Sequence, residues 1–152
     1  MRTTDPGTIN KLGETERPYK GETVSFNIEN IKKVIDDAHC ETEIDGDGDI
    51  YISEGLEFPC WVGLNEENET LRIMTYAMLK DDADELKALQ LANRINTKFF
   101  PNAVAVNNGK LESYYYVVLD QSMSEKNLLT ILRRCTSSFV NAVREEDSEG
   151  LI

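Results

Sequence analysis

Asp45, Asp47 and Asp49 stand at alternate positions in the stretch ETEIDGDGDIYISEG (residues 41–55), with glycines between them and Glu54 shortly after. Calcium loops of the EF-hand type space their oxygen ligands in this way, with a glycine at the sharp turn and a final glutamate. Counted from Glu43, Gly48 is the sixth residue and Glu54 the twelfth, as such a loop requires. The loop at 43–54 is therefore a candidate cation site.

The same residues also suit a solvated turn, because Asp and Gly are the residues that turns favour. An EF-hand loop leads into a helix, whereas the residues after this loop alternate like a strand, and Gly55 and Pro59 oppose an exiting helix. We therefore predict a turn that carries a helix into a strand. A calcium-responsive module using Asp45, Asp47, Asp49 and Glu54 is the alternative.

A small enzyme using His39 or a cysteine is a second alternative. His39 is the only histidine, and its neighbour Cys40 would not face it on a helix. A zinc site would need His39 and all three cysteines, and these lack the usual Cys-x-x-Cys spacing. The segment DGDGD is not a phosphate-binding loop, because it carries acidic side chains where such a loop has accessible backbone amides and positive charge. We predict no enzymatic activity, no catalytic residues and no cofactor.

Composition narrows the choice of partner. The chain has 152 residues, 40% hydrophobic and 29% charged, which suits one globular domain. Its net charge of −12 repels nucleic acid phosphates and anionic lipid, and attracts basic protein segments.

No run of apolar residues is long enough to span a membrane, and the opening residues do not resemble a secretory signal. Three scattered cysteines favour free thiols, so we expect a cytoplasmic protein.

Hydrophobic periodicity predicts the elements that must position these residues. Helices are expected within 25–39, within 81–100 with a capping box at Asp82 and Glu85, and from a cap at Ser122 to Val143. Strands are expected at 49–53, 58–65 and 70–79, followed by a hairpin around an Asn-Gly turn at 108–109. The order α-β-β-β-α-β-β-α implies an α+β fold, with helices mainly on one face of a five-stranded antiparallel sheet.

The flanking segments are predicted to be flexible. Residues 1–22 form an expected N-terminal arm, 23–145 the α+β domain and 146–152 a flexible C-terminal tail.

One face of the predicted sheet is aromatic. In a strand, Tyr114 and Tyr116 point to one side and Tyr115 to the other. On its strand, Trp61 points to the face opposite to that of its apolar neighbours. Met74 and Tyr76 likewise point to the face opposite to that of Ile73. Trp61, Met74, Tyr76, Tyr114 and Tyr116 are thus candidates for binding a protein or peptide, with a basic partner or a second copy of the chain as the expected occupant. Ordinary sheet packing also explains aromatic residues in strands.

Four segments, taken in order, resemble the YbjN family of bacterial proteins. They are DGDGDIYI at the first strand, LQLANRIN in the middle helix, FFPNAVAV with the NNGKLES hairpin, and SMSEKNLLTILRRC opening the last helix. The resemblance runs from about Val24 to Val143. It implies a fold similar to class I type III secretion chaperones, which are small acidic proteins that bind polypeptides and often dimerise. It also implies a role in sensory regulation and supplies no catalytic residues.

Overall fold

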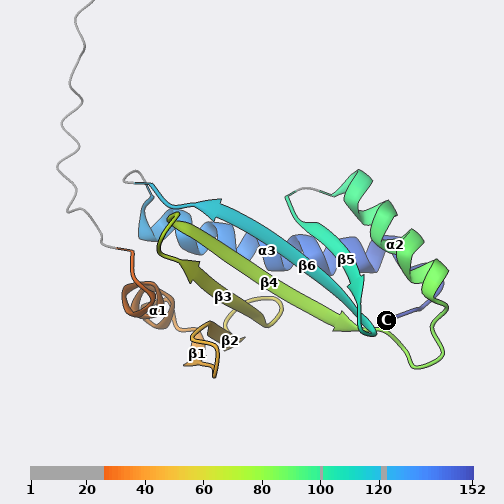
Figure 1. The fold of residues 1–152 in the computed structure, drawn as a ribbon, viewed down its shortest axis with the longest axis horizontal. Helices are drawn as coiled ribbons and strands as arrows, with labels where there is room; N and C mark the ends of the chain where they lie inside the picture. Colours follow the sequence, from red (N-terminus) through yellow and green to blue (C-terminus); the bar gives the residue numbers. More distant parts are fainter. Residues whose placement is uncertain (1–25, 100, 121–122) are drawn as a thin grey trace, which may run out of the picture.

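The computed structural model describes residues 26–99, 101–120 and 123–152, so the arm predicted at 1–22 lies outside the described residues. Three helices and six strands follow one another along the chain, as Figure 1 shows. In chain order they are α1 (Ile28–Asp37), β1 (Glu41–Ile44), β2 (Ile50–Glu54), β3 (Cys60–Asn65), β4 (Thr70–Met78), α2 (Glu85–Lys98), β5 (Ala103–Asn107), β6 (Lys110–Val118) and α3 (Glu125–Glu146).

The strands form one antiparallel sheet in the order β1-β2-β3-β4-β6-β5, which confirms the predicted α+β class. The predicted count of five strands is wrong, because Glu41–Ile44 is itself a strand. Its sequence, ETEI, is short and has no apolar alternation that would mark it as a strand. Backbone pairing with β2, in which Ile44 lies opposite Ile50, makes these residues extended.

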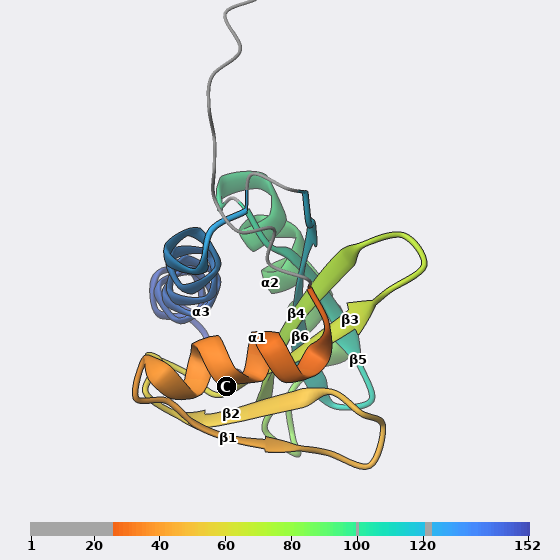
Figure 2. The ribbon, with the colours of Figure 1, turned by 90° about the vertical axis from the view of Figure 1, so that its left-hand side faces the viewer.

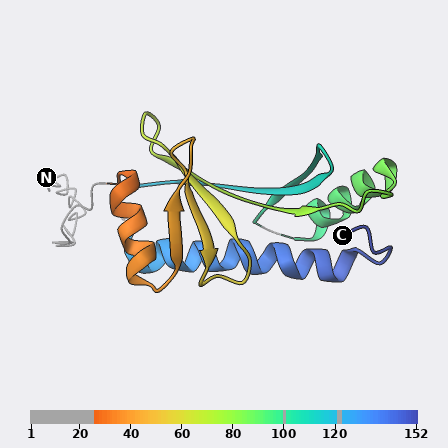
Figure 3. The same cartoon turned by 90° about the horizontal axis from the view of Figure 1, so that it is seen from below.

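The helices lie on one side of the sheet. Figure 2, an end-on view, shows α1 and α3 on the same side of the strands, and Figure 3 shows α3 running lengthwise along the sheet. Two hydrophobic clusters fill the space between these layers. One joins α1, the strands β2 to β4 and the first half of α3, and the other joins α2, β5 and the second half of α3. None of the helices in the described parts of the chain is both long and apolar enough to cross a bilayer.

Helix starts differ slightly from the predicted caps. Asp84 caps α2, with its side chain accepting a hydrogen bond from the N–H of Lys87, so the predicted capping box at Asp82 is wrong. Asp84 has the extended backbone that a cap needs directly before the first turn. Ser124 caps α3 in the same way, and Ser122, the predicted cap, lies outside the described residues.

The C-terminal residues contact the rest of the domain. Leu151 is buried in the second hydrophobic cluster, and its carbonyl oxygen accepts a hydrogen bond from the N–H of Lys80. Glu146, also buried, forms ion pairs with Lys98 and Arg94 of α2. The segment for which we predicted flexibility, 146–152, therefore makes specific contacts, and its mobility stays a prediction that we test below.

Candidate functional site: the uncovered face of the sheet

Five predicted residues share the face of the sheet that points away from the helices, which we call the outer face. Trp61 pairs with Met74 across β3 and β4, and Met74 pairs with Tyr114 across β4 and β6. Tyr76 and Tyr116 lie on the same side, since they are two residues from Met74 and Tyr114. Tyr115, by contrast, packs against the first hydrophobic cluster. Alternation along the strands thus predicted the shared face, and partner binding by it stays a prediction.

Aromatic rings cross the outer face from strand to strand. The ring centroids of Tyr51 and Trp61 are 4.5 Å apart, and those of Trp61 and Tyr76 are 5.3 Å apart and stacked. The ammonium of Lys110 lies 4.2 Å from the centre of the Tyr76 ring, a cation–π contact. These contacts restrain the rings against one another, so the face is partly ordered before anything binds to it.

Large apolar side chains remain in contact with solvent on this face. Tyr116 is 61% exposed, Met78 is 58% exposed and Val118 is 70% exposed. All three belong to β4 or β6, the long central strands of Figure 1. Tyr116 and Val118 are neighbours on β6, whereas Met78 lies at the other end of β4, opposite Lys110. Exposed apolar side chains that share one face are typical of protein interaction sites.

The hydroxyl of Tyr114 is hydrogen-bonded on the outer face. It donates a hydrogen bond to Glu112 at 2.5 Å. This bond is the main reason that the pKa of Tyr114 rises to about 12, with burial adding to the effect. The phenol therefore stays protonated at neutral pH, and it acts as a hydrogen-bond donor rather than as a base.

The acidic loop folds as a turn between β1 and β2. Asp45 Oδ1 accepts hydrogen bonds from the N–H groups of Asp47 and Asp49, at 2.9 and 3.0 Å. Asp49 forms an ion pair with Arg72 of β4, and Glu54 lies on β2 opposite Glu41. The structure does not bring the four predicted ligands together, and in the described residues no three His, Cys, Asp or Glu side chains are arranged to hold a metal ion. Cation binding by the loop stays a prediction.

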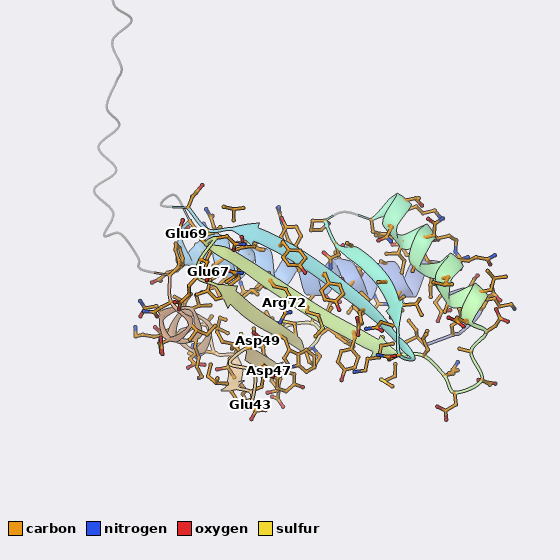
Figure 4. The ribbon with its side chains drawn as sticks, viewed as in Figure 1. Glu43, Asp47, Asp49, Glu67, Glu69 and Arg72 are labelled. Carbon is orange, nitrogen blue, oxygen red and sulfur yellow. The ribbon has the colours of Figure 1, made fainter. Side chains whose placement is uncertain are left out.

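A hollow of about 360 Å³ lies beside this ion pair on the outer face. Gly63, Arg72 and Tyr116 are among the residues that line it. Figure 4 shows Arg72 among acidic side chains from the β1–β2 and β3–β4 hairpins: Glu43, Asp47, Asp49, Glu67 and Glu69. Sequence reasoning missed Gly63 and Arg72, although the position of Arg72 two residues before Met74 indicated the outer face.

The histidine and the cysteines of the enzyme alternative differ in burial. His39 is exposed at the end of α1, and none of the contacts among the described residues joins it to a thiol. All three cysteines are buried and free. Burial raises the pKa values of Cys60 and Cys135 to about 12, so both thiols stay protonated and are poor nucleophiles.

Comparison with known proteins identifies relatives of this fold. The sequence profile of the YbjN family, described as "Putative bacterial sensory transduction regulator", matches residues 27–146. A search of the curated proteins found no match.

Two solved structures are similar in fold. One is the crystal structure of "YbjN, a putative transcription regulator from E. coli", with a TM-score of 0.65 and 14% sequence identity, covering 82% of this chain and 94% of that chain. The other is the HopA1-SchA chaperone-effector complex, with a TM-score of 0.52 and 12% identity, covering 76% of this chain and 88% of that chain. At these identities the similarity concerns the fold alone.

Proposed function

This chain belongs to the YbjN family, and we propose that it is a non-enzymatic regulator or adaptor that binds another protein through the outer face of its sheet. The observation that carries the proposal is the outer face itself. Its aromatic and methionine side chains contact neither hydrophobic cluster, and Tyr116, Met78 and Val118 are mostly exposed.

The residues of this face suit an adaptable contact with a polypeptide. Trp61 and Tyr76 are rigid, stacked rings, whereas Met74 and Met78 have flexible side chains that adjust to different partners. Tyrosine, tryptophan and methionine are all enriched at protein interfaces. The similar fold in a complex of a chaperone with an effector also supports a polypeptide partner.

Charge favours a partner with basic segments. The chain carries a net charge of −12, and the acidic side chains labelled in Figure 4 lie on two sides of Arg72, which is paired with Asp49. Complementary charge raises the rate at which partners meet and excludes acidic competitors. A second copy of the chain has the same negative charge, so the proposal favours a different protein over self-association at this face.

Two further features support the proposal. The buried thiols with raised pKa values and the exposed His39 support a non-enzymatic role. Cysteines that are all free support a cytoplasmic location, which is part of the proposal.

The test is an affinity capture from cell lysate with three forms of the chain: the parent, a Tyr114→Ser/Tyr116→Ser variant and a Leu86→Ser control. Leu86 is 64% exposed on α2, close to the 61% of Tyr116, but it lies away from the outer face. We expect one protein to be captured by the parent and the control and lost with the tyrosine variant.

The captured partner is then titrated against the purified chain while Trp61 fluorescence is recorded. Trp61 is the only tryptophan and lies within the aromatic row, so occupation of the face changes its emission. Equal capture by all three forms, or binding that leaves the Trp61 emission unchanged, would place the interaction elsewhere and contradict the proposal.

A further inference from the structure

The long helix α3 has one side that faces away from the sheet. Figure 3 shows the sheet above this helix and no other described element below it. Leu128, Leu132 and Phe139 point the other way and are buried in the two hydrophobic clusters. Since the helix has 3.6 residues per turn, the remaining positions form a stripe opposite to the buried side. We call this stripe the α3 face, and its exposed residues are Lys126, Asn127, Thr130, Arg133, Arg134, Asn141, Arg144 and Glu145.

The α3 face is basic, although the chain as a whole is acidic. It carries four cations, Lys126, Arg133, Arg134 and Arg144, and one acid, Glu145, in a chain of net charge −12. Within the described parts of the chain, none of these four cations forms an ion pair. The four charged groups are therefore accessible to an anion from outside the chain.

The other cations in the described residues have partners. The ion-paired ones are Lys32, Lys33, Arg72, Lys87, Arg94 and Lys98. Lys80 donates a hydrogen bond to the carbonyl of Gly150, and Lys110 lies over the ring of Tyr76. Unpaired positive charge is thus concentrated on one face of one helix.

We propose that the α3 face binds an acidic segment of another protein. From Lys126 to Arg144 the cations extend over about 27 Å of helix, at 1.5 Å per residue. An acidic segment that lies along α3 meets them in turn, and each contact is a charge-assisted hydrogen bond. The proposal does not rest on the proposed function of the outer face, because that face is on the opposite side of the sheet.

Two observations favour a polypeptide over a nucleic acid. Half-buried apolar side chains border the cations, with Leu129 one turn before Arg133 and Ile131 one turn before Arg134. A protein segment offers both carboxylates and apolar side chains to this surface, whereas a phosphate backbone uses the charges alone. The net charge of −12 also repels a polyanion that extends beyond the helix.

The experiment measures the binding of a labelled oligoglutamate by fluorescence anisotropy. The probe has about 20 residues, enough to span the α3 face. The parent is compared with Arg133→Gln/Arg134→Gln and with a control, Lys33→Gln/Lys87→Gln. Lys33 and Lys87 lie on α1 and α2 with side chains 76% and 52% exposed. Both double variants lower the net charge from −12 to −14, so they differ only in where the charge is lost.

We expect the parent and the control to bind the oligoglutamate with similar affinity. The arginine variant should bind it about fivefold more weakly, as the loss of two exposed ion pairs implies. Added salt should weaken binding to the parent, because it screens exposed charges. Equal affinity of the two double variants, or no binding by the parent, would overturn the proposal.

A labelled oligothymidylate of the same length distinguishes the two classes of partner. Tighter binding of this DNA than of the oligoglutamate, lost in Arg133→Gln/Arg134→Gln, would assign the α3 face to nucleic acid and overturn the proposal. Backbone amide chemical shifts of the parent, recorded during the oligoglutamate titration, locate the contact without any variant. We expect the largest changes at the exposed residues of α3, and changes confined to the strands would overturn the proposal.

Discussion

Arg72 on β4 reaches across Gly63 on β3 to Asp49 at the start of β2, with 2.5 Å between Nη2 and Oδ2. The ion pair joins the acidic turn to the central strands and engages the last of the three alternating aspartates. The ion pair also requires a glycine at position 63. A Cβ on Gly63 would lie 2.5 Å from Asp49 Oδ1 and 3.2 Å from Arg72 Nη2.

Replacing Gly63 with alanine should therefore separate this pair. The pair is partly exposed, so we expect Gly63→Ala to lower the free energy of unfolding by only about 1 kcal/mol. Urea denaturation measures this change. Gly46→Ala is the matched control, since a Cβ at Gly46 meets nothing within 4 Å. Equal loss of stability in the two variants would show that the Asp49–Arg72 contact does not depend on the space above Gly63.

Calcium should leave the acidic loop unchanged. Asp45 already accepts two backbone hydrogen bonds and Asp49 is paired with Arg72, so both would have to exchange these partners for a cation. We expect the emission of Trp61, whose neighbour Tyr51 follows the loop, to stay constant at about 5 mM calcium, above the dissociation constants of exposed calcium modules. A saturable change that is lost in an Asp45→Asn variant would instead establish the calcium-responsive alternative.

The buried thiols should make the protein sensitive to alkaline pH. The pKa of Cys60 is about 12 in the folded chain against an ordinary value of 9.0, which approximates the unfolded chain. Between these values the unfolded chain releases the thiol proton and the folded chain keeps it, so stability falls as pH rises, and it is unaffected by this group below pH 9.0.

Cys60→Ala should make this fall less steep, by up to about 1.4 kcal/mol per pH unit. The measurement compares the slopes of unfolding free energy against pH, because the substitution also changes the core and thus the absolute stability. Parallel slopes for the parent and Cys60→Ala above pH 9.0 would show that burial does not hold the proton on this thiol.

The C-terminal contacts should contribute to stability. Leu151 is 7% exposed within the second hydrophobic cluster, and its N–H donates to Asp147 Oδ1 at 2.8 Å. Leu151→Ser should lower the free energy of unfolding by about 2 kcal/mol, since it removes buried apolar volume. Thermal unfolding checks this, with Ser148→Ala, an exposed position in the same segment, as the control. A flexible tail predicts equal melting temperatures for Leu151→Ser and the parent.

The alternation of side chains along each strand predicted most residues of the candidate site. Alternation placed Tyr114 and Tyr116 opposite to Tyr115, and the same parity placed Trp61 with Met74 once β3 and β4 paired. The strand at Glu41–Ile44 was missed because its extended form comes from pairing with β2 and not from its own residues. The predicted cap at Asp82 was displaced to Asp84 because several acids in DDADE satisfy the same local rule.

By itself, the sequence determined the α+β class, the order of most elements and which side chains share a strand face, because these depend on the period of the backbone and on neighbours along the chain. Only the tertiary structure decided which face stays uncovered, because the docking of all three helices on the other side determines it. It also decided that Asp49 is paired with Arg72, 23 residues away, and that the side chain of Asn96 is hydrogen-bonded to Val104 of β5. Such polar partners meet only after the sheet has formed, and no periodicity in the chain encodes their approach.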